Sequence, residues 1–354
     1  MKQQGLMQAT IYASAVLAGT LYCASPAWGG DTTSANASPS QPVGQAPQEQ
    51  NHPPRVETLI SSTGVLPPAG QFVIEPFLQY AHSSSSIAAV QGFVVAQVLA
   101  VGIINIQQYS NDTAMGGFTL RYGVTNRVEA DIRVPFVWSQ QNLNVTNLTN
   151  TGLQQGFNSS GSGLGDIEAA IHWQVNQGGA DWPYFVANLR AKSMTGSSPF
   201  SMPYNGAAIA AGIPGILAQQ PTGTGFWAVE PSLTAIYPTD PAVLYGNIGY
   251  IWNIGHDVGG RYISPGNAID VGFGMGISLN DRTSVSLGYD QEIVNPPTVN
   301  GVQPPLTQTL EVGSFLVGWS FQVNKRTNVD LNLAVGATRD APDVQLTLRV
   351  PYSI

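Results

Sequence analysis

The stretch "RVEADIRVPFVW", residues 127–138, decides the fold. If it is a β-strand, Glu129, Asp131 and Arg133 share one face, because side chains alternate at period two. Apolar or small side chains alternate with them on the other face. A helix would scatter both sets around its axis, and Pro135 disfavours a helix. The stretch therefore predicts a strand between a polar environment and an apolar one, which is either the core of a soluble sheet or membrane lipid.

The same alternation recurs along the chain and predicts twelve strands. They lie at 71–82, 114–123, 127–139, 164–177, 182–193, 225–237, 242–253, 267–279, 282–292, 310–323, 326–337 and 343–353. Most are about 10 to 13 residues long, whereas about 5 to 6 is usual in soluble proteins and about 9 to 11 in tilted membrane-crossing strands. Strand length therefore favours the membrane.

The predicted connections alternate in size. Short turns occur at 123–127, 175–181, 237–242, 280–282 and 324–326. Longer segments rich in Gly, Asn, Ser and Pro occur at 140–163, 194–224, 254–266 and 293–309. Short periplasmic turns and long extracellular loops are typical of outer-membrane barrels. The predicted fold class is all-β, a transmembrane antiparallel up-and-down β-barrel of about twelve strands.

The start of the chain predicts export. Residues 1–29 combine Lys2 with an apolar run and small residues, which is typical of a signal peptide. The single cysteine, Cys23, lies inside this segment, so the mature chain would have no disulfide. Residues 30–69 are rich in Ser, Pro and Gln and predict a disordered periplasmic tether. Residues 70–354 would form the barrel, placed in the outer membrane of a Gram-negative bacterium by the barrel-assembly machinery and surrounded by its lipid.

The composition agrees with this prediction. Charged residues make up 10% of the chain, against about 25% in typical soluble domains. The net charge of −8 argues against a nucleic-acid partner.

Residues 83–113 fit the barrel pattern least well. The apolar run 87–104 is almost long enough for a membrane helix, but it contains Gln91, Gly92, Gln97 and Gly102. A hairpin, or a segment folded into the barrel mouth, remains open beside the helix. If it folds inward, residues 83–113 are the candidate plug or gate.

Three segments carry a resemblance to a known family: 116–138, 163–175 and 318–352. The most specific part is the strand–turn–strand unit "RYGVTNR" (121–127), which is followed by "RVPF" (133–136). Over residues 70–353 the chain resembles the bacterial outer-membrane transporters named for the MetA pathway of phenol degradation. The resemblance implies an outer-membrane barrel for small, often hydrophobic or aromatic, compounds. It supplies no binding residues.

The predicted lumen face carries most of the charged residues. The acids are Glu75, Glu129, Asp131, Asp166, Glu168, Glu230, Asp270, Asp290, Glu292 and Asp330, and the cationic or titratable groups are Arg121, Arg133, His172, Arg190, Lys192 and Arg349. They pair across strands and rigidify the barrel in one interpretation. In the other, their acidic excess favours cations or neutral solutes over anions.

Other chemistry finds little support in the sequence. Gly272, Gly274 and Gly276 are not followed by a helix pattern, so they predict room for an opposing bulky group rather than a phosphate loop. The four histidines lack ligand spacing, so neither a metal nor another cofactor is predicted. Aromatic residues near strand ends predict interfacial girdles. They are Tyr122, Trp138, Trp173, Trp182, Tyr184, Trp227, Tyr237, Tyr245, Trp252 and Tyr352.

The predicted function is a channel or transporter for passive, selective passage of small organic molecules, not an enzyme. Two alternatives remain open. One is a structural or secretion-associated barrel with a polypeptide partner. The other is a lipid-hydrolysing barrel that uses His172. The solute, the direction of passage and the oligomeric state do not follow from the sequence.

Overall fold

A computed structural model describes residues 66–84, 89–90, 93–94, 106–146, 154–178, 182–210, 217–304 and 307–354. The predicted signal peptide and nearly all of the predicted tether lie outside the described residues.

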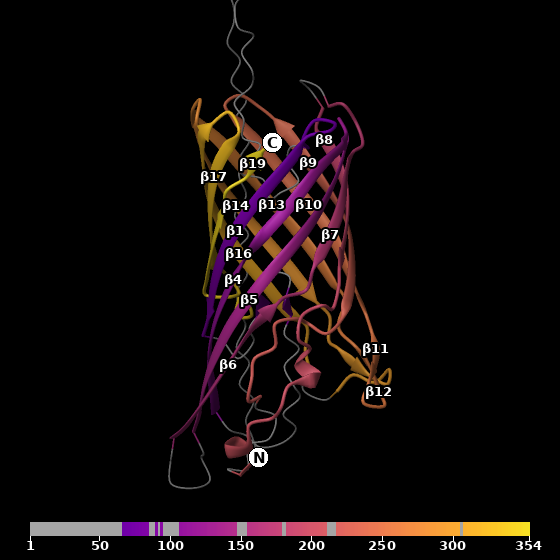
Figure 1. Cartoon of the computed structure of the whole chain (residues 1–354), viewed down its shortest axis with the longest axis vertical. Helices are drawn as coiled ribbons and strands as arrows, with labels where there is room; N and C mark the ends of the chain where they lie inside the picture. Colours follow the sequence, from indigo (N-terminus) through magenta and orange to yellow (C-terminus); the bar gives the residue numbers. More distant parts are fainter. Residues whose placement is uncertain are drawn as a thin grey trace, which may run out of the picture. The chain divides into compact units, whose positions relative to one another are not determined.

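Twelve successive positions form a closed antiparallel wall (Figure 1). The strands are β1 (Phe72–Ser83), β4 (Ile106–Thr125), β5 (Val128–Thr146), β6 (Gln154–Leu164), β7 (Glu168–Gln174), β8 (Tyr184–Lys192), β9 (Trp227–Pro238), β10 (Ala242–Ile254), β13 (Ala268–Asn280), β14 (Thr283–Val294), β16 (Leu310–Asn324), β17 (Thr327–Gly336), β18 (Val344–Arg349) and β19 (Tyr352–Ser353). Strands β6 and β7 share the position beside β5, and β18 and β19 share the position beside β1. Pairing of β1 with β18 closes the barrel, as the sequence predicts.

The wall has its polar side chains inside and its apolar side chains outside. Along β1 buried and exposed residues alternate: Glu75 is 5% exposed, whereas Leu78 is 57% exposed. In the stretch 127–138, Glu129 is fully buried and Phe136 is 56% exposed. A soluble protein would reverse this arrangement, so the exposed apolar belt identifies the transmembrane type of barrel. No helix among the described residues is long and apolar enough to cross a membrane.

The two ends of the barrel differ, as the sequence predicts. At one end, the turn end, only residues 126–127, 239–241, 281–282 and 325–326 separate consecutive strands. The other end, the loop end, holds the long connections. They contain β11 (His256–Val258), β12 (Arg261–Ser264), β15 (Thr298–Val299), the 3-10 helix η1 (Pro199–Ser201) and the helix α1 (Gly206–Ala210). Figure 1 shows β6, β11 and β12 at the end opposite the C-terminus.

Two boundaries were predicted wrongly. Residues 140–163 do not form one long loop, because β5 continues to Thr146 and pairs with β6. Residues 106–113 are not part of a plug, because they pair with 139–146 as part of β4. These extensions are polar on both faces, so they carry no alternation that would reveal a strand.

The rest of the candidate plug is only partly described. Strands β2 (Ala89–Val90) and β3 (Phe93–Val94) pair as an antiparallel hairpin, one of the open possibilities. Residues 85–88, 91–92 and 95–105 lie outside the described residues.

Candidate functional site: the charged lumen

An ion-paired layer joins β1, β4 and β5 near the turn end. Arg121 donates from Nε and Nη2 to the two carboxylate oxygens of Glu129, the second at 3.0 Å. Its Nη1 lies 3.8 Å from Glu75, and Arg349 lies 3.8 Å from the other oxygen of Glu75. Glu129 is fully buried, so this bidentate pairing offsets the cost of removing its charge from water.

Beside this layer, His172 links β5 to β8. One ring nitrogen, Nε2, lies 2.7 Å from Asp131 and the other, Nδ1, lies 2.8 Å from the Asn188 amide oxygen. Asn188 uses its amide nitrogen to donate to the Val186 carbonyl and the Ser232 hydroxyl, which orients its oxygen toward the ring. Because that oxygen can only accept, Nδ1 carries a proton and Nε2 shares a second one with Asp131.

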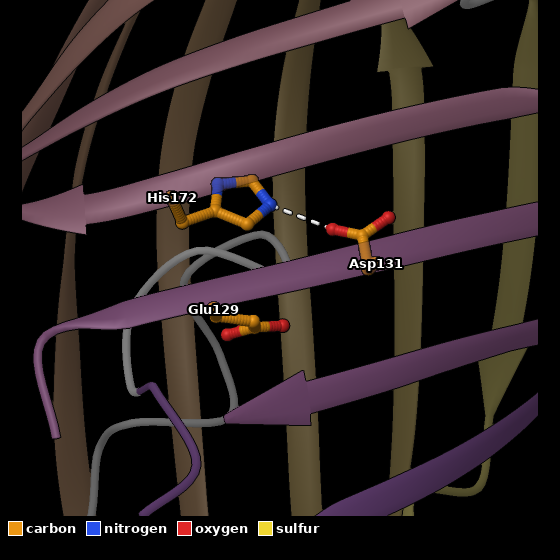
Figure 2. A group of neighbouring side chains, drawn as sticks. All are labelled: Glu129, Asp131 and His172. Carbon is orange, nitrogen blue, oxygen red and sulfur yellow. Dashed lines mark hydrogen bonds and ion pairs between the residues drawn. The ribbon is translucent and has the colours of Figure 1, made fainter. Parts of the chain in front are cut away.

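Glu129, Asp131 and His172 form the one group among the described residues with the composition of a metal site (Figure 2). Their candidate ligand atoms lie within 4.8 Å of one another. The sequence did not predict this proximity, since His172 is 41 residues from Asp131. Arg121 already holds both oxygens of Glu129, however, and His172 already binds Asp131. The arrangement is that of an ion-pair network, and both ring nitrogens of His172 contact groups other than a serine.

A second network lies on β7, β8 and β9. Arg190 donates to Glu230 from Nε at 3.0 Å and from Nη2, and its Nη1 lies 3.7 Å from Glu168. The Arg190 side chain is nevertheless 43% exposed. Its neighbour Leu189 faces outward and is 49% exposed, so Arg190 points into the barrel at the height of the apolar belt. Water therefore reaches the barrel interior at this height.

Asp166 fastens the long connection 193–226 to the wall. It lies before β7 and is fully buried, although the sequence placed it within a strand. One oxygen accepts from the Gly196 amide at 3.0 Å, and the other accepts from the Thr224 amide and hydroxyl at 2.8 Å each. Lys192 donates to the same hydroxyl at 2.8 Å and lies 3.8 Å from Asp166.

The fastened connection packs on the inner face of β6. Gln220 donates to Ser159 at 2.6 Å, and Thr222 donates to the Leu164 carbonyl at 2.8 Å. A Cβ added at Gly161 would lie 1.9 Å from the Gln220 carbonyl oxygen, so only glycine permits this approach. Since the inward side chains of β5 pair across from Ser159 and Gly161, the connection lies inside the loop end of the barrel.

The remaining predicted lumen residues also face inward but are less fully paired. Asp270 accepts from Asn247 at 2.9 Å and is the cross-strand partner of Glu292. Asp330 accepts from Ser320 at 2.6 Å and lies across from Arg349. Asp290, on β14, lies across from Gly272, where a Cβ would meet its carboxylate. All predicted lumen residues thus lie on the inner wall, distributed among several networks.

The glycines of β13 leave room as predicted. The Tyr245 phenol lies over Gly274 and Gly288, where an added Cβ would be 2.4 and 2.6 Å from its oxygen. Tyr184 and Tyr245 were therefore wrongly assigned to the interfacial girdle. They pack inside against Val186 and Ile236 near the turn end. The outward positions of Trp138, Trp173, Trp182, Trp227, Trp252, Tyr122 and Tyr352 agree with girdles.

Sequence reasoning missed the apolar part of the lumen. Phe77, Ala81, Met115 and Val137 form a buried cluster on the inner faces of β1, β4 and β5. The alternation alone places Phe77 inside, because it lies two residues from Glu75. It was missed because apolar residues were assigned to lipid. The partners of Asp166 gave no such signal, since they lie in an irregular connection.

No protein-family model matches the chain. Among solved structures, the chain is similar to an outer-membrane channel from Pseudomonas putida F1, with a TM-score of 0.55 and 14% identity over 83% of this chain and 98% of that chain. It is also similar to the translocator domain of the autotransporter NalP from Neisseria meningitidis, with a TM-score of 0.44 and 7% identity over 84% of this chain and 93% of that one. At such identities the first likeness shows the fold alone, that of an outer-membrane β-barrel. The resemblance to the MetA-named transporters is not confirmed and stays a prediction.

Proposed function

We propose that the protein is an outer-membrane channel for passive, selective passage of small organic molecules. The observation that carries this proposal is the Arg190 side chain, which points into the barrel and is still 43% exposed. A wall sealed throughout by packed side chains would leave no water-accessible guanidinium at this height. A charged interior inside an apolar belt is what a wet pore requires.

Selectivity follows from the size of the barrel and the inward connection. Twelve strands enclose a narrower interior than the 16 to 18 strands of general porins. The connection 193–226 further fills the loop end. The resemblance noted above suggests hydrophobic or aromatic solutes, and the acidic excess of the lumen favours neutral or cationic ones. Export by a signal peptide and insertion by the assembly machinery belong to the same proposal.

Cysteine accessibility in lipid bilayers tests whether the interior is wet. In a Cys23→Ser background, Arg190→Cys should react with a membrane-impermeant methanethiosulfonate bearing a trimethylammonium group, and the reaction should change the single-channel conductance. Leu189→Cys is the matched control, because the adjacent side chain faces lipid and should stay unmodified. Absence of steady conductance in the unmodified protein, together with an unreactive thiol in the Arg190→Cys variant, would refute the proposal and favour a structural or secretion role.

A further inference from the structure

Arg133 differs from the other lumen arginines in what it contacts. Its guanidinium carbon lies 4.2 Å from the centre of the Phe77 ring. Its Nη2 lies 3.8 Å from the sulfur of Met115, which is a weak acceptor. The Phe77 ring reaches Arg133 by crossing β4 at Gly117, where an added Cβ would lie 3.1 Å from the ring. The plane of the guanidinium is thus supported by an aromatic face.

The strands beside Arg133 do not supply it with a carboxylate. Its cross-strand neighbours are Thr119 on β4 and Glu168 on β7. Thr119 is neutral, and Glu168 faces Arg190 at 3.7 Å. Among the described residues Arg133 makes no ion pair, whereas Arg190 makes two.

An arginine stays ionised and has five donors but no acceptor, so a guanidinium without a carboxylate leaves donors to be satisfied by water or by a ligand. Two parallel N–H groups match the two oxygens of a carboxylate. We propose that Arg133, held on the Phe77 ring, is a lumen binding site for the carboxylate group of a small organic solute. This inference rests on the proposed function and deepens it by naming a solute class.

The surrounding charges favour a carboxylate over a phosphate ester. Acids outnumber bases on the lumen wall, and Glu75 and Glu168 lie on the strands next to or near Arg133. Repulsion grows with the charge of the solute, so a monoanion is less disfavoured than a dianion. The general lumen field still favours cations as current carriers, while Arg133 offers one local site for an anionic group.

Equilibrium dialysis tests the site without requiring conduction. The full chain in detergent micelles is dialysed against radiolabelled benzoate or benzamide, which have nearly the same shape but differ in charge, with protein-free micelles as blank. Benzoate should bind at least about tenfold more tightly than benzamide. Arg133→Gln should abolish this difference. Arg282→Gln, the same change at an exposed position in the turn after β13, should preserve it.

Further arms separate the alternatives. Phe77→Leu keeps the charge but removes the aromatic support, so benzoate should bind several-fold more weakly; this variant also serves if Arg133→Gln does not fold. Equal binding of benzoate and benzamide by the unsubstituted chain would overturn the inference, as would tight benzoate binding that survives Arg133→Gln. Inorganic phosphate that competes as well as unlabelled benzoate would overturn the carboxylate assignment. Conductance without benzoate preference contradicts only this inference, whereas benzoate binding without conductance contradicts only the proposed function.

Discussion

Substitution of Asp166 should release the connection 193–226 while leaving the barrel intact. Asp166→Asn keeps the size of the side chain but replaces one acceptor oxygen with a donor. If the remaining oxygen stays on Thr224, the new amide group faces the Gly196 amide, donor against donor. Lys192 also loses its nearby charge at 3.8 Å.

The magnitude follows from these contacts. An unsatisfied buried donor costs about 1–3 kcal/mol, and breaking a buried ion pair costs about 3–5 kcal/mol. Because Lys192 keeps its bond to Thr224, we expect a net loss near the lower end, about 3 kcal/mol. This loss corresponds to a roughly 100-fold increase in the population of the released connection.

Amide hydrogen exchange of the protein in lipid nanodiscs measures this population. The Gly196 and Thr224 amides should exchange roughly 100-fold faster, and the ladder amides of β5 and β8 should not change. Asp257→Asn is the matched control, because Asp257 accepts one backbone bond from Gly260 in an exposed hairpin. Unchanged exchange at Gly196 and Thr224 would refute the reasoning. Faster exchange throughout the wall would show that Asp166 stabilises the barrel rather than the connection.

Three further substitutions test the packing of the wall, each by urea titration of the protein in lipid vesicles. Arg121→Ala leaves the fully buried Glu129 without its bidentate partner, so the free energy of unfolding should fall by about 3–5 kcal/mol, and a loss below about 1 kcal/mol would contradict the ion-pair layer. Leu78→Arg places a charge on the lipid face and should cost about 2–4 kcal/mol; no cost would argue that this face is wet. Gly274→Val should destabilise the barrel because its Cβ would lie 2.4 Å from a tyrosine oxygen, whereas Gly206→Val, with open space around it, should cost much less.

The strands within the apolar belt could be predicted because two solvents act on their two faces. In β1 and β5, lipid selects Leu78 and Phe136 on one side, and the lumen selects Glu75 and Glu129 on the other. Beyond the belt both faces meet the same solvent, and this selection ends. The extension of β4 from residue 106, which reads "IQQYSND", therefore shows no alternation that could mark it as a strand.

The lumen residues could be assigned to a face, but their partners could not be predicted. Partner choice depends on strand register and side-chain reach. Glu168 lies directly across from Arg133, yet its carboxylate faces Arg190. Asp166 binds Thr224, which is 58 residues away in a connection without periodicity. Contacts of this kind are set by the closed barrel and not by any local pattern.

The position of Phe77 shows why the face of a side chain is more informative than its polarity. An aromatic ring on the lumen face is not needed to shield lipid, and a barrel filled only for rigidity would be served by a neutral polar side chain there. Phe77 instead lies over Gly117 and supports a guanidinium that has no carboxylate partner among the described residues. Two costs meet at one place, since an arginine without an acid and a strand glycine both reduce stability. Residues that reduce stability in a well-paired wall are expected where a solute supplies the missing contact.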